Sequence, residues 1–478
     1  MRTDELPEAA FVAPDGSNAE AVRELSEGVL DAVLEALTTA TDRSPLPEDP
    51  AVPDAAIPET GRSGDALLAE TARAMEGSMN PHHPGYVGHM DTQPSLVSVL
   101  GDLVAAAVNN NMLSAEMSPV LSELEVGLCR EFAETFGLGP EPGGVMTSGG
   151  SLANLQALAV ARNRAFDAAE TGLAGLDPVL FASEVAHTSL RKAAMLLGLG
   201  TDAVQPVPTD GDSRMDPDAL DEAVEAARAG GSDPFCVVAT AGTTTTGNVD
   251  PLGPIADASD DHDLWFHVDA AYGGVLVFSD RYRHLLDGIE RADSVTFNPQ
   301  KWCYVAKTCA TLLLSDRTAL EESFRVGAPY VDRGGTPNLG ELTVQGTRHA
   351  DVLKCWLTFG HLGRRGIERL VEESYRLTDY LVAGIEERGS LELVSTPETN
   401  IVCFRANPGN GTDPDALNAA LREHLLGERD VYLSLPTYRG SKWLRVVLLN
   451  PQSDEAVLDR LLDGVDDFLG GGRDGTGQ

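Results

Sequence analysis

Near the middle of the chain an apolar run carries a single carboxylate: Leu264-Trp265-Phe266-His267-Val268-Asp269-Ala270-Ala271-Tyr272-Gly273. The run predicts a buried strand, and open α/β sheets bind ligands at the carboxyl ends of their strands. A carboxylate buried there needs a cationic partner or several donors, because leaving it unpaired costs several kcal/mol. For Asp269 the protonated ring nitrogen of a planar ligand is one such partner, and capping of a following helix is the alternative.

Short apolar strands and helices alternate on both sides of this run. Strands are predicted at 144–146, 179–182, 236–240 and 264–268, and helices at 96–108, 119–136, 151–168 and 187–199. This alternation predicts an α/β fold with a mostly parallel central sheet covered by helices on both faces. After residue 356 a long helix at 366–387 precedes strands at 391–395, 401–405 and 443–449 and a helix at 455–469, which is typical of an α+β domain.

We therefore expect three parts in the chain. Residues 1–98 form an N-terminal helical arm, residues 99–358 a large ligand-binding domain, and residues 359–478 a small C-terminal α+β domain. The glycine-rich tail from Gly470 is expected to be disordered.

A lysine follows the apolar run, in Asp293-Ser294-Val295-Thr296-Phe297-Asn298-Pro299-Gln300-Lys301-Trp302. A lysine flanked by apolar segments has a depressed pKa and forms imines readily. The chain has five lysines, and Lys307, in the same loop, is the main rival of Lys301 for this role.

Three more strand-end segments carry polar groups. Thr147-Ser148-Gly149-Gly150-Ser151-Leu152-Ala153-Asn154 predicts a strand, a glycine turn and a helix N-terminus, which together can hold a phosphate. An ordinary helix after a tight turn gives the same pattern. His187 follows the strand at 179–182 and can stack on a planar ring or serve a structural role. The threonine-rich loop at 239–247 can reach the ligand or be a plain turn.

Charge excludes some partners. The 478 residues include 74 acidic and 35 basic side chains, a formal net charge of −39. Such a charge repels nucleic acid and anionic membranes, so we expect neither as a partner. The excess of acid over lysine predicts a halophilic source, since concentrated salt screens the self-repulsion; an acidic mesophilic protein is the alternative.

The chain has no apolar run of roughly 18 residues and begins with an acidic segment, which predicts a cytoplasmic protein. The six scattered cysteines indicate reduced thiols and no metal site.

Together these segments resemble the group II pyridoxal 5′-phosphate (PLP) dependent amino-acid decarboxylases, which have the aspartate-aminotransferase fold, also called fold type I. The family includes aromatic-L-amino-acid, glutamate, cysteine-sulfinate and diaminobutyrate decarboxylases, and the resemblance runs from about His83 to Pro451. It implies that Lys301 forms the Schiff base with PLP and that Asp269 partners the pyridine nitrogen. His187 would stack on the ring, with Ala271 on its other face. The resemblance also implies that the phosphate is held by Gly149, Gly150, Ser151 and Asn298. Thr244 would lie near the cofactor and the substrate.

Other positions bear on the substrate and the reaction. Ala328-Pro329-Tyr330 resembles the loop whose tyrosine helps protonate Cα, and Arg445 stands where the family's arginine binds the substrate α-carboxylate, although a surface arginine gives the same pattern. Gln300 replaces the family's histidine and would contact the cofactor through its amide. Residues 109–120 and 346–351 resemble the glutamate and cysteine-sulfinate branch, whereas His89 resembles the diaminobutyrate branch and is a candidate substrate contact.

The sequence therefore predicts PLP-dependent decarboxylation of an L-amino acid to its amine and CO₂. An obligate homodimer with the active site at its interface follows from the resemblance. The alternatives are another fold type I reaction (C–S or C–C bond cleavage, or transamination) and a PLP-binding protein without catalytic activity. The sequence does not identify the amino acid.

Overall fold

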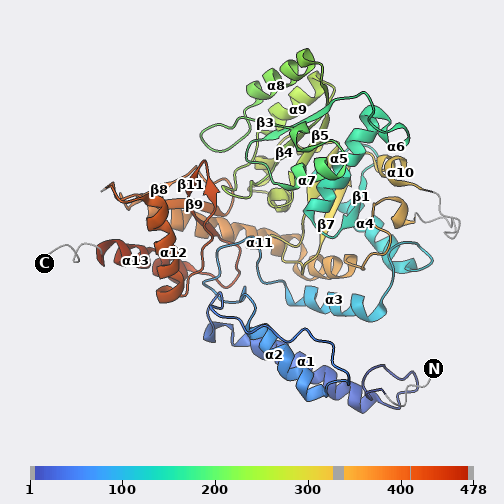
Figure 1. Ribbon diagram of the computed structural model, residues 1–478, viewed down its shortest axis with the longest axis vertical. Helices are drawn as coiled ribbons and strands as arrows, with labels where there is room; N and C mark the ends of the chain where they lie inside the picture. Colours follow the sequence, from blue (N-terminus) through green and yellow to red (C-terminus); the bar gives the residue numbers. More distant parts are fainter. Residues whose placement is uncertain (1–5, 327–337, 410, 472–478) are drawn as a thin grey trace. The chain divides into compact units, whose positions relative to one another are not determined.

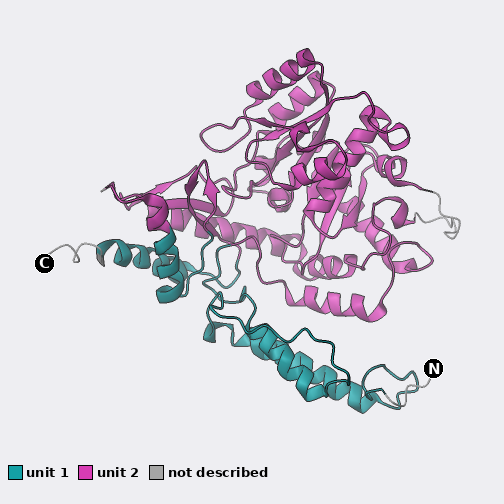
Figure 2. Ribbon diagram, viewed as in Figure 1, with its two compact units in different colours: residues 1–88, 419–434, 450–478 teal, residues 89–418, 435–449 magenta. Residues whose placement is uncertain are grey.

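The computed structural model describes residues 6–326, 338–409 and 411–471, so the predicted loop residue Tyr330 and the end of the predicted disordered tail lie outside the described residues. The chain divides into two compact units, coloured separately in Figure 2, and each is described by itself. The three-part division expected from the sequence stays a prediction. No helix within the described ranges is both long enough and apolar enough to cross a membrane.

The first unit comprises residues 1–88, 419–434 and 450–478. Its helices are α1 (Ala19–Thr38), α2 (Gly64–Glu76), the end of α12 (Pro414–Arg429) and α13 (Glu455–Gly471). Ser63 begins α2 because its hydroxyl accepts the Ala66 N–H, as an N-cap does. Neither α1 nor α2 has a buried residue, although both are amphipathic.

The second unit, residues 89–418 and 435–449, contains a seven-stranded sheet in the order β1-β7-β6-β5-β4-β2-β3 (Figure 1). The strands are β1 (Gly143–Thr147), β2 (Pro178–Ser183), β3 (Val204–Val207), β4 (Asp233–Thr240), β5 (Trp265–Ala270), β6 (Ser294–Phe297) and β7 (Ala310–Leu314). β7 alone runs against its two neighbours, and the other pairs are parallel. The prediction of a mostly parallel sheet is confirmed.

Helices cover both faces of this sheet (Figure 1). The helices α4 (Pro119–Phe136), α5 (Gly150–Phe166), α7 (Ser189–Leu196), α8 (Pro217–Gly230) and α9 (Leu252–Asp261) contact its strands, and α3 (Leu96–Val108), α6 (Ala168–Thr171), α10 (Thr318–Phe324) and α11 (Val352–Glu386) pack against other helices. Every residue of β1, β2, β6 and β7 is buried, as expected of strands covered on both faces.

A smaller antiparallel sheet, β12-β9-β8, follows α11 in the chain. Its strands are β8 (Leu391–Leu393), β9 (Ile401–Ala406) and β12 (Leu444–Val447), and a two-stranded hairpin joins Thr437–Tyr438 to Ser441–Lys442. This arrangement confirms the predicted strands near 391, 401 and 443. The long helix α11 has a kink at Gly363, with φ 63° and ψ 170°; the part after this kink corresponds to the predicted helix at 366–387, and the part from Val352 to the kink precedes it.

Candidate active site

A cavity of about 390 Å³ lies at the carboxyl ends of the central strands. Because β1, β4, β5 and β6 all point the same way, the residues that end these strands meet at one edge of the sheet. The lining residues are Ser148, Gly149, Gly150, Ser151, Leu152, Asn154, His187, Thr240, Gly242, Thr244, Asp269, Ala271, Tyr272, Asn298, Gln300 and Lys301. All ten residues that the sequence predicts to bind the cofactor are among them.

Lys301 reaches this cavity from the turn after β6, where its backbone N–H donates to the Asn298 carbonyl at 3.0 Å. Burial lowers the pKa of the Lys301 ammonium, and the nearby carboxylates of Asp269 and Asp91 oppose this shift only in part. A neutral amine is the nucleophile that attacks a carbonyl. The rival Lys307 is 43% exposed and pairs with Asp91, so the geometry favours Lys301.

Asp269 is the fifth residue of β5 and is 6% exposed. Its Oδ2 accepts a hydrogen bond from Asn154 Nδ2 at 2.8 Å, and its Oδ1 accepts one from the Ala271 N–H at 3.2 Å. The next helical segment, Gly273–Phe278, has no side-chain cap, which leaves the helix-capping alternative without support. The carboxylate is positioned to meet a cation in the cavity.

His187 lies just before α7, so the predicted helix at 187–199 is two residues too long at its start. The cause is local, because His187 Nδ1 accepts the Ser189 N–H at 3.2 Å and lies 2.8 Å from Ser189 Oγ. Burial lowers the pKa of the His187 imidazole, although Asp269 opposes the shift. This shift favours the neutral form of the ring at the cavity wall.

The glycine turn leaves room for an anion beside the N-terminus of α5. Gly149 has φ 154° and ψ 162°, a conformation essentially restricted to glycine. A Cβ on Gly150 would lie 2.9 Å from Asn298 Nδ2, so a larger residue there would displace the Asn298 amide. The helix N-terminus adds N–H donors and the positive end of its dipole.

Arg445 and His89 do not line the cavity but adjoin it. Arg445, on β12, is 7% exposed, so the surface-arginine alternative is wrong. Its Nη1 donates to the Thr244 carbonyl at 2.5 Å, and its Nη2 lies 3.3 Å from His89 Nδ1. Thr244 lines the cavity, so Arg445 contacts a residue of the cavity lining, and His89 lies next to Arg445.

Residues 47–407 match the family model described as the pyridoxal-dependent decarboxylase conserved domain. The chain belongs to this family. It is 34% identical to the cysteine sulfinic acid decarboxylase of Mus musculus over 428 residues, which cover 86% of this chain and 87% of that protein. It is 33% identical to the L-2,4-diaminobutyrate decarboxylase of Rhizobium meliloti over 417 residues, which cover 86% and 83%.

A solved structure agrees with these relatives. The crystal structure of Oryza sativa TDC with PLP and tryptamine matches with a TM-score of 0.90 at 25% identity, covering 96% of this chain and 99% of that one. This decarboxylase has fold type I, uses PLP and acts on amino acids.

The cavity of the decarboxylase fits PLP on observations of its own residues. Asn298 Oδ1 and Thr240 Oγ1 are buried and have no partner among the described residues, which suits a polar ligand in contact with them. Gln300 Oε1 accepts the Cys309 N–H at 2.6 Å, so the amide Nε2 remains as a donor. Together with the glycine turn, these groups suit the phosphate and ring of the cofactor.

Sequence reasoning gave no role to the lining residues Asn154 and Tyr272, and it included Thr240 only as part of the threonine-rich loop at 239–247. Thr240 ends β4 and is paired in register with Asp269, so strand-end position was an available signal for it. Asn154 lies inside a helix, and only the direction of α5 brings it to the site.

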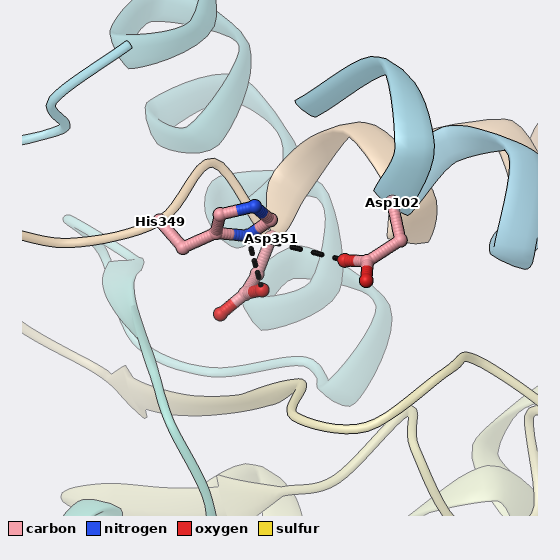
Figure 3. Close-up of side chains that lie close together, drawn as sticks. All are labelled: Asp102, His349 and Asp351. Carbon is pink, nitrogen blue, oxygen red and sulfur yellow. Dashed lines mark hydrogen bonds and ion pairs between the residues drawn. The ribbon is translucent and has the colours of Figure 1, made fainter. Parts of the chain in front are cut away.

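A second group of ionisable side chains, Asp102, His349 and Asp351, lies outside this cavity (Figure 3). His349 Nδ1 is 3.1 Å from Asp351 and 3.9 Å from Asp102. The Lys354 ammonium, whose side chain is 2% exposed, lies 3.0 Å from Asp102 and 2.9 Å from Asp351. Burial lowers the Lys354 pKa, but the two carboxylates outweigh it and the pKa is raised. Lysine thus supplies the cation of this group, which joins α3 to α11, and we assign no metal to it.

Proposed function

We propose that this decarboxylase holds PLP through the Lys301 amine and removes the α-carboxyl group of an L-amino acid, releasing the amine and CO₂. The observation that carries the proposal is the meeting of Lys301, Asp269, His187 and the glycine turn in one cavity. Bound PLP supplies an electron sink for the electrons of the broken Cα–carboxylate bond.

Each residue has a defined part in this proposal. Asp269 would keep the ring nitrogen of PLP protonated, and His187 and Ala271, which also line the cavity, would contact the ring. The turn at 149–151, with Asn298 and Gln300, holds the phosphate. The neutral His187 also exchanges a proton at Cα. Tyr330 is proposed as its partner in that step, on the family resemblance alone.

Arg445 is proposed to bind the substrate α-carboxylate, with Thr244 at the cofactor and substrate and His89 as a neighbour. A buried guanidinium is always charged and can make paired hydrogen bonds to a carboxylate. Arg445 Nη1 is 2.5 Å from the Thr244 carbonyl, which holds the guanidinium at the cavity wall.

The test is a product analysis with added PLP in molar KCl. Candidate substrates come from the relatives, namely cysteine sulfinate and 2,4-diaminobutyrate, together with aspartate, glutamate, tyrosine, tryptophan and DOPA. Amine and CO₂ in equal amounts, absent with Lys301→Ala, are expected from one of them. Keto acid or sulfide instead of CO₂ would favour transamination or lyase chemistry on the same scaffold, and a bound cofactor without any product would favour an inactive PLP-binding protein.

The protein is proposed to be a homodimer with the active site at its interface. Five apolar side chains of α3 are between 42% and 62% exposed, and their spacing puts them on one helical face: Leu96, Leu100, Leu103, Val104 and Val108. Exposed apolar patches of this kind mark interfaces, and a second copy of the chain would cover this one.

Sedimentation tests the dimer. The wild-type protein is expected to have twice the chain mass, and Leu103→Glu to sediment as a monomer. The control Leu196→Glu, at a side chain 67% exposed on α7, is expected to leave the dimer intact. A monomeric wild type at all concentrations would contradict the proposal.

A cytoplasmic location in a halophile is also proposed. The net charge of −39 supports it, and the six cysteines are free and buried, as suits a reducing compartment. The unfolding midpoint is expected to rise strongly from dilute buffer to molar KCl; indifference to salt would refute the halophilic origin.

A further inference from the structure

The side chain of Asn154, in helix α5, contacts four polar side chains on other elements of the fold. It is 1% exposed. Its Nδ2 lies 2.8 Å from Asp269 Oδ2 and 2.9 Å from Ser189 Oγ. Its Oδ1 accepts from Thr296 Oγ1 at 2.7 Å and lies 3.1 Å from His267 Nε2. One side chain thus joins α5 to β5, β6 and α7.

The orientation of this amide follows from chemistry. A carboxylate only accepts hydrogen bonds, so the N–H side of Asn154 must face Asp269. The Asn154 carbonyl then faces His267 Nε2, which must carry the hydrogen. With the hydrogen on Nε2, the other ring nitrogen of His267, Nδ1, accepts from the Ser294 hydroxyl at 2.8 Å, although Nδ1 also lies 3.1 Å from the Ser294 carbonyl, which can only accept.

The hydrogen bonds on the far side of His267 can have the same donor-to-acceptor direction. Trp265 Nε1 donates to Ser294 Oγ at 2.9 Å, so the Ser294 hydroxyl hydrogen is directed at His267. Burial lowers the pKa of His267 to about 4, which keeps the ring neutral, as this series requires. In the tautomer with the hydrogen on Nε2, Trp265, Ser294, His267 and Asn154 donate in sequence, and the last hydrogen bond ends on Asp269.

A branch leads from Asn154 to His187. Ser189 Oγ accepts from Asn154 and lies 2.8 Å from His187 Nδ1. The Ser189 N–H also donates to this Nδ1, so the single hydrogen of the neutral His187 ring is on Nε2. The residue that holds Asp269 thus also contacts the residue that holds His187.

We propose that Asn154 is a positioning residue for the cofactor site, which fixes the Asp269 carboxylate toward the ring nitrogen and, through Ser189, ties it to the His187 ring. The proposal rests on the proposed function for the place of the cofactor. A merely structural amide would hold α5 to the sheet without affecting the cofactor's ring nitrogen. Asn154→Asp separates these roles, because it keeps the size and the oxygen toward His267 but places an oxygen instead of N–H against Asp269.

The experiment compares Asn154→Ala and Asn154→Asp with the control Asn418→Ala. Asn418 is also fully buried, and its amide bonds Ala406 and Pro414 far from the cavity lining in sequence. Two quantities are measured with PLP labelled with ¹⁵N at the ring nitrogen: the PLP dissociation constant and the ring-nitrogen chemical shift, which reports protonation. Both Asn154 variants are expected to weaken PLP binding at least tenfold, because neither donates to Asp269, and Asn154→Ala is expected to shift the ring nitrogen toward its unprotonated value. Asn418→Ala is expected to lose stability with both quantities unchanged.

The proposal would be overturned if both Asn154 variants had the PLP dissociation constant and the ring-nitrogen chemical shift of the wild type. If these variants do not fold, ¹⁵N-histidine spectra of the cofactor-free wild type decide it, since His267 must carry its hydrogen on Nε2; a hydrogen on Nδ1 overturns it. These readouts do not depend on turnover. A wild type that binds PLP without releasing CO₂ would refute the proposed reaction and leave Asn154 to be judged on the ring nitrogen. A wild type that binds no PLP would refute both.

Discussion

Acidification is predicted to destabilise this protein through His267, which lies fully buried in β5. Its pKa falls from 6.5 to about 4 because burial disfavours the charged ring. The folded state therefore binds fewer protons than the unfolded state between these values. The stability that the neutral ring contributes is complete above pH 6.5 and is lost as the pH falls toward 4, by up to about 3 kcal/mol at 1.36 kcal/mol per pH unit.

The assay is denaturant unfolding of the cofactor-free protein from pH 7.5 to 4 at constant molar KCl. His267→Gln is the matched variant, because glutamine can still donate toward Asn154 and accept from Ser294 but does not titrate. Carboxylates titrate equally in both proteins, so they cancel in the difference. The wild type is expected to lose about 3 kcal/mol more than the variant over this range. A difference between the two that stays constant with pH would refute the reasoning.

Three other substitutions test separate parts of the structure. Gly150→Ala is expected to weaken PLP binding about tenfold, measured by fluorescence titration, because its Cβ would lie 2.9 Å from Asn298 Nδ2. Arg445→Lys is expected to raise KM about tenfold in steady-state kinetics with the PLP dissociation constant unchanged, since the paired carboxylate contact is lost; an unchanged KM would contradict it. Lys354→Met is expected to lower the free energy of unfolding by about 1–3 kcal/mol by removing the cation of its ion-pair cluster. The exposed Lys192→Met is its control, expected within about 0.5 kcal/mol.

Local signals in the sequence predict some elements well. The helices predicted at 96–108 and 119–136 coincide with α3 and α4. Their ends are marked by Pro119 at the start of α4, by Gly137 with φ 80° after it, and by Asn109 with φ 47° after α3. Residues that favour or tolerate such conformations allow helix ends to be predicted from the sequence.

Other elements depend on tertiary pairing. The strand expected before Lys301 is present as β6, but β7 was not predicted as a strand, because its five fully buried residues show no alternation. β7 is also the one strand that reverses direction, and its pairing with β1, the first strand in the chain and its neighbour in the large sheet, leaves no local signal.

The same contrast holds for the site. Strand-end position pointed to Asp269 and Lys301, because the ends of parallel strands meet wherever the sheet forms. His187 lies at the cavity as predicted, but its position before α7 depends on a hydrogen bond to Ser189. Asn154 could not be singled out, since its four partners come from segments 35 to 142 residues away and only the fold assembles them.

The most direct test of the account is to find which lysine carries the cofactor. The PLP-loaded protein is reduced with borohydride, digested, and its peptides are mapped by mass spectrometry. The account predicts a pyridoxyl group on Lys301 and none on Lys307. Labelling of Lys307, or no labelled lysine in a protein that retains PLP, would contradict it.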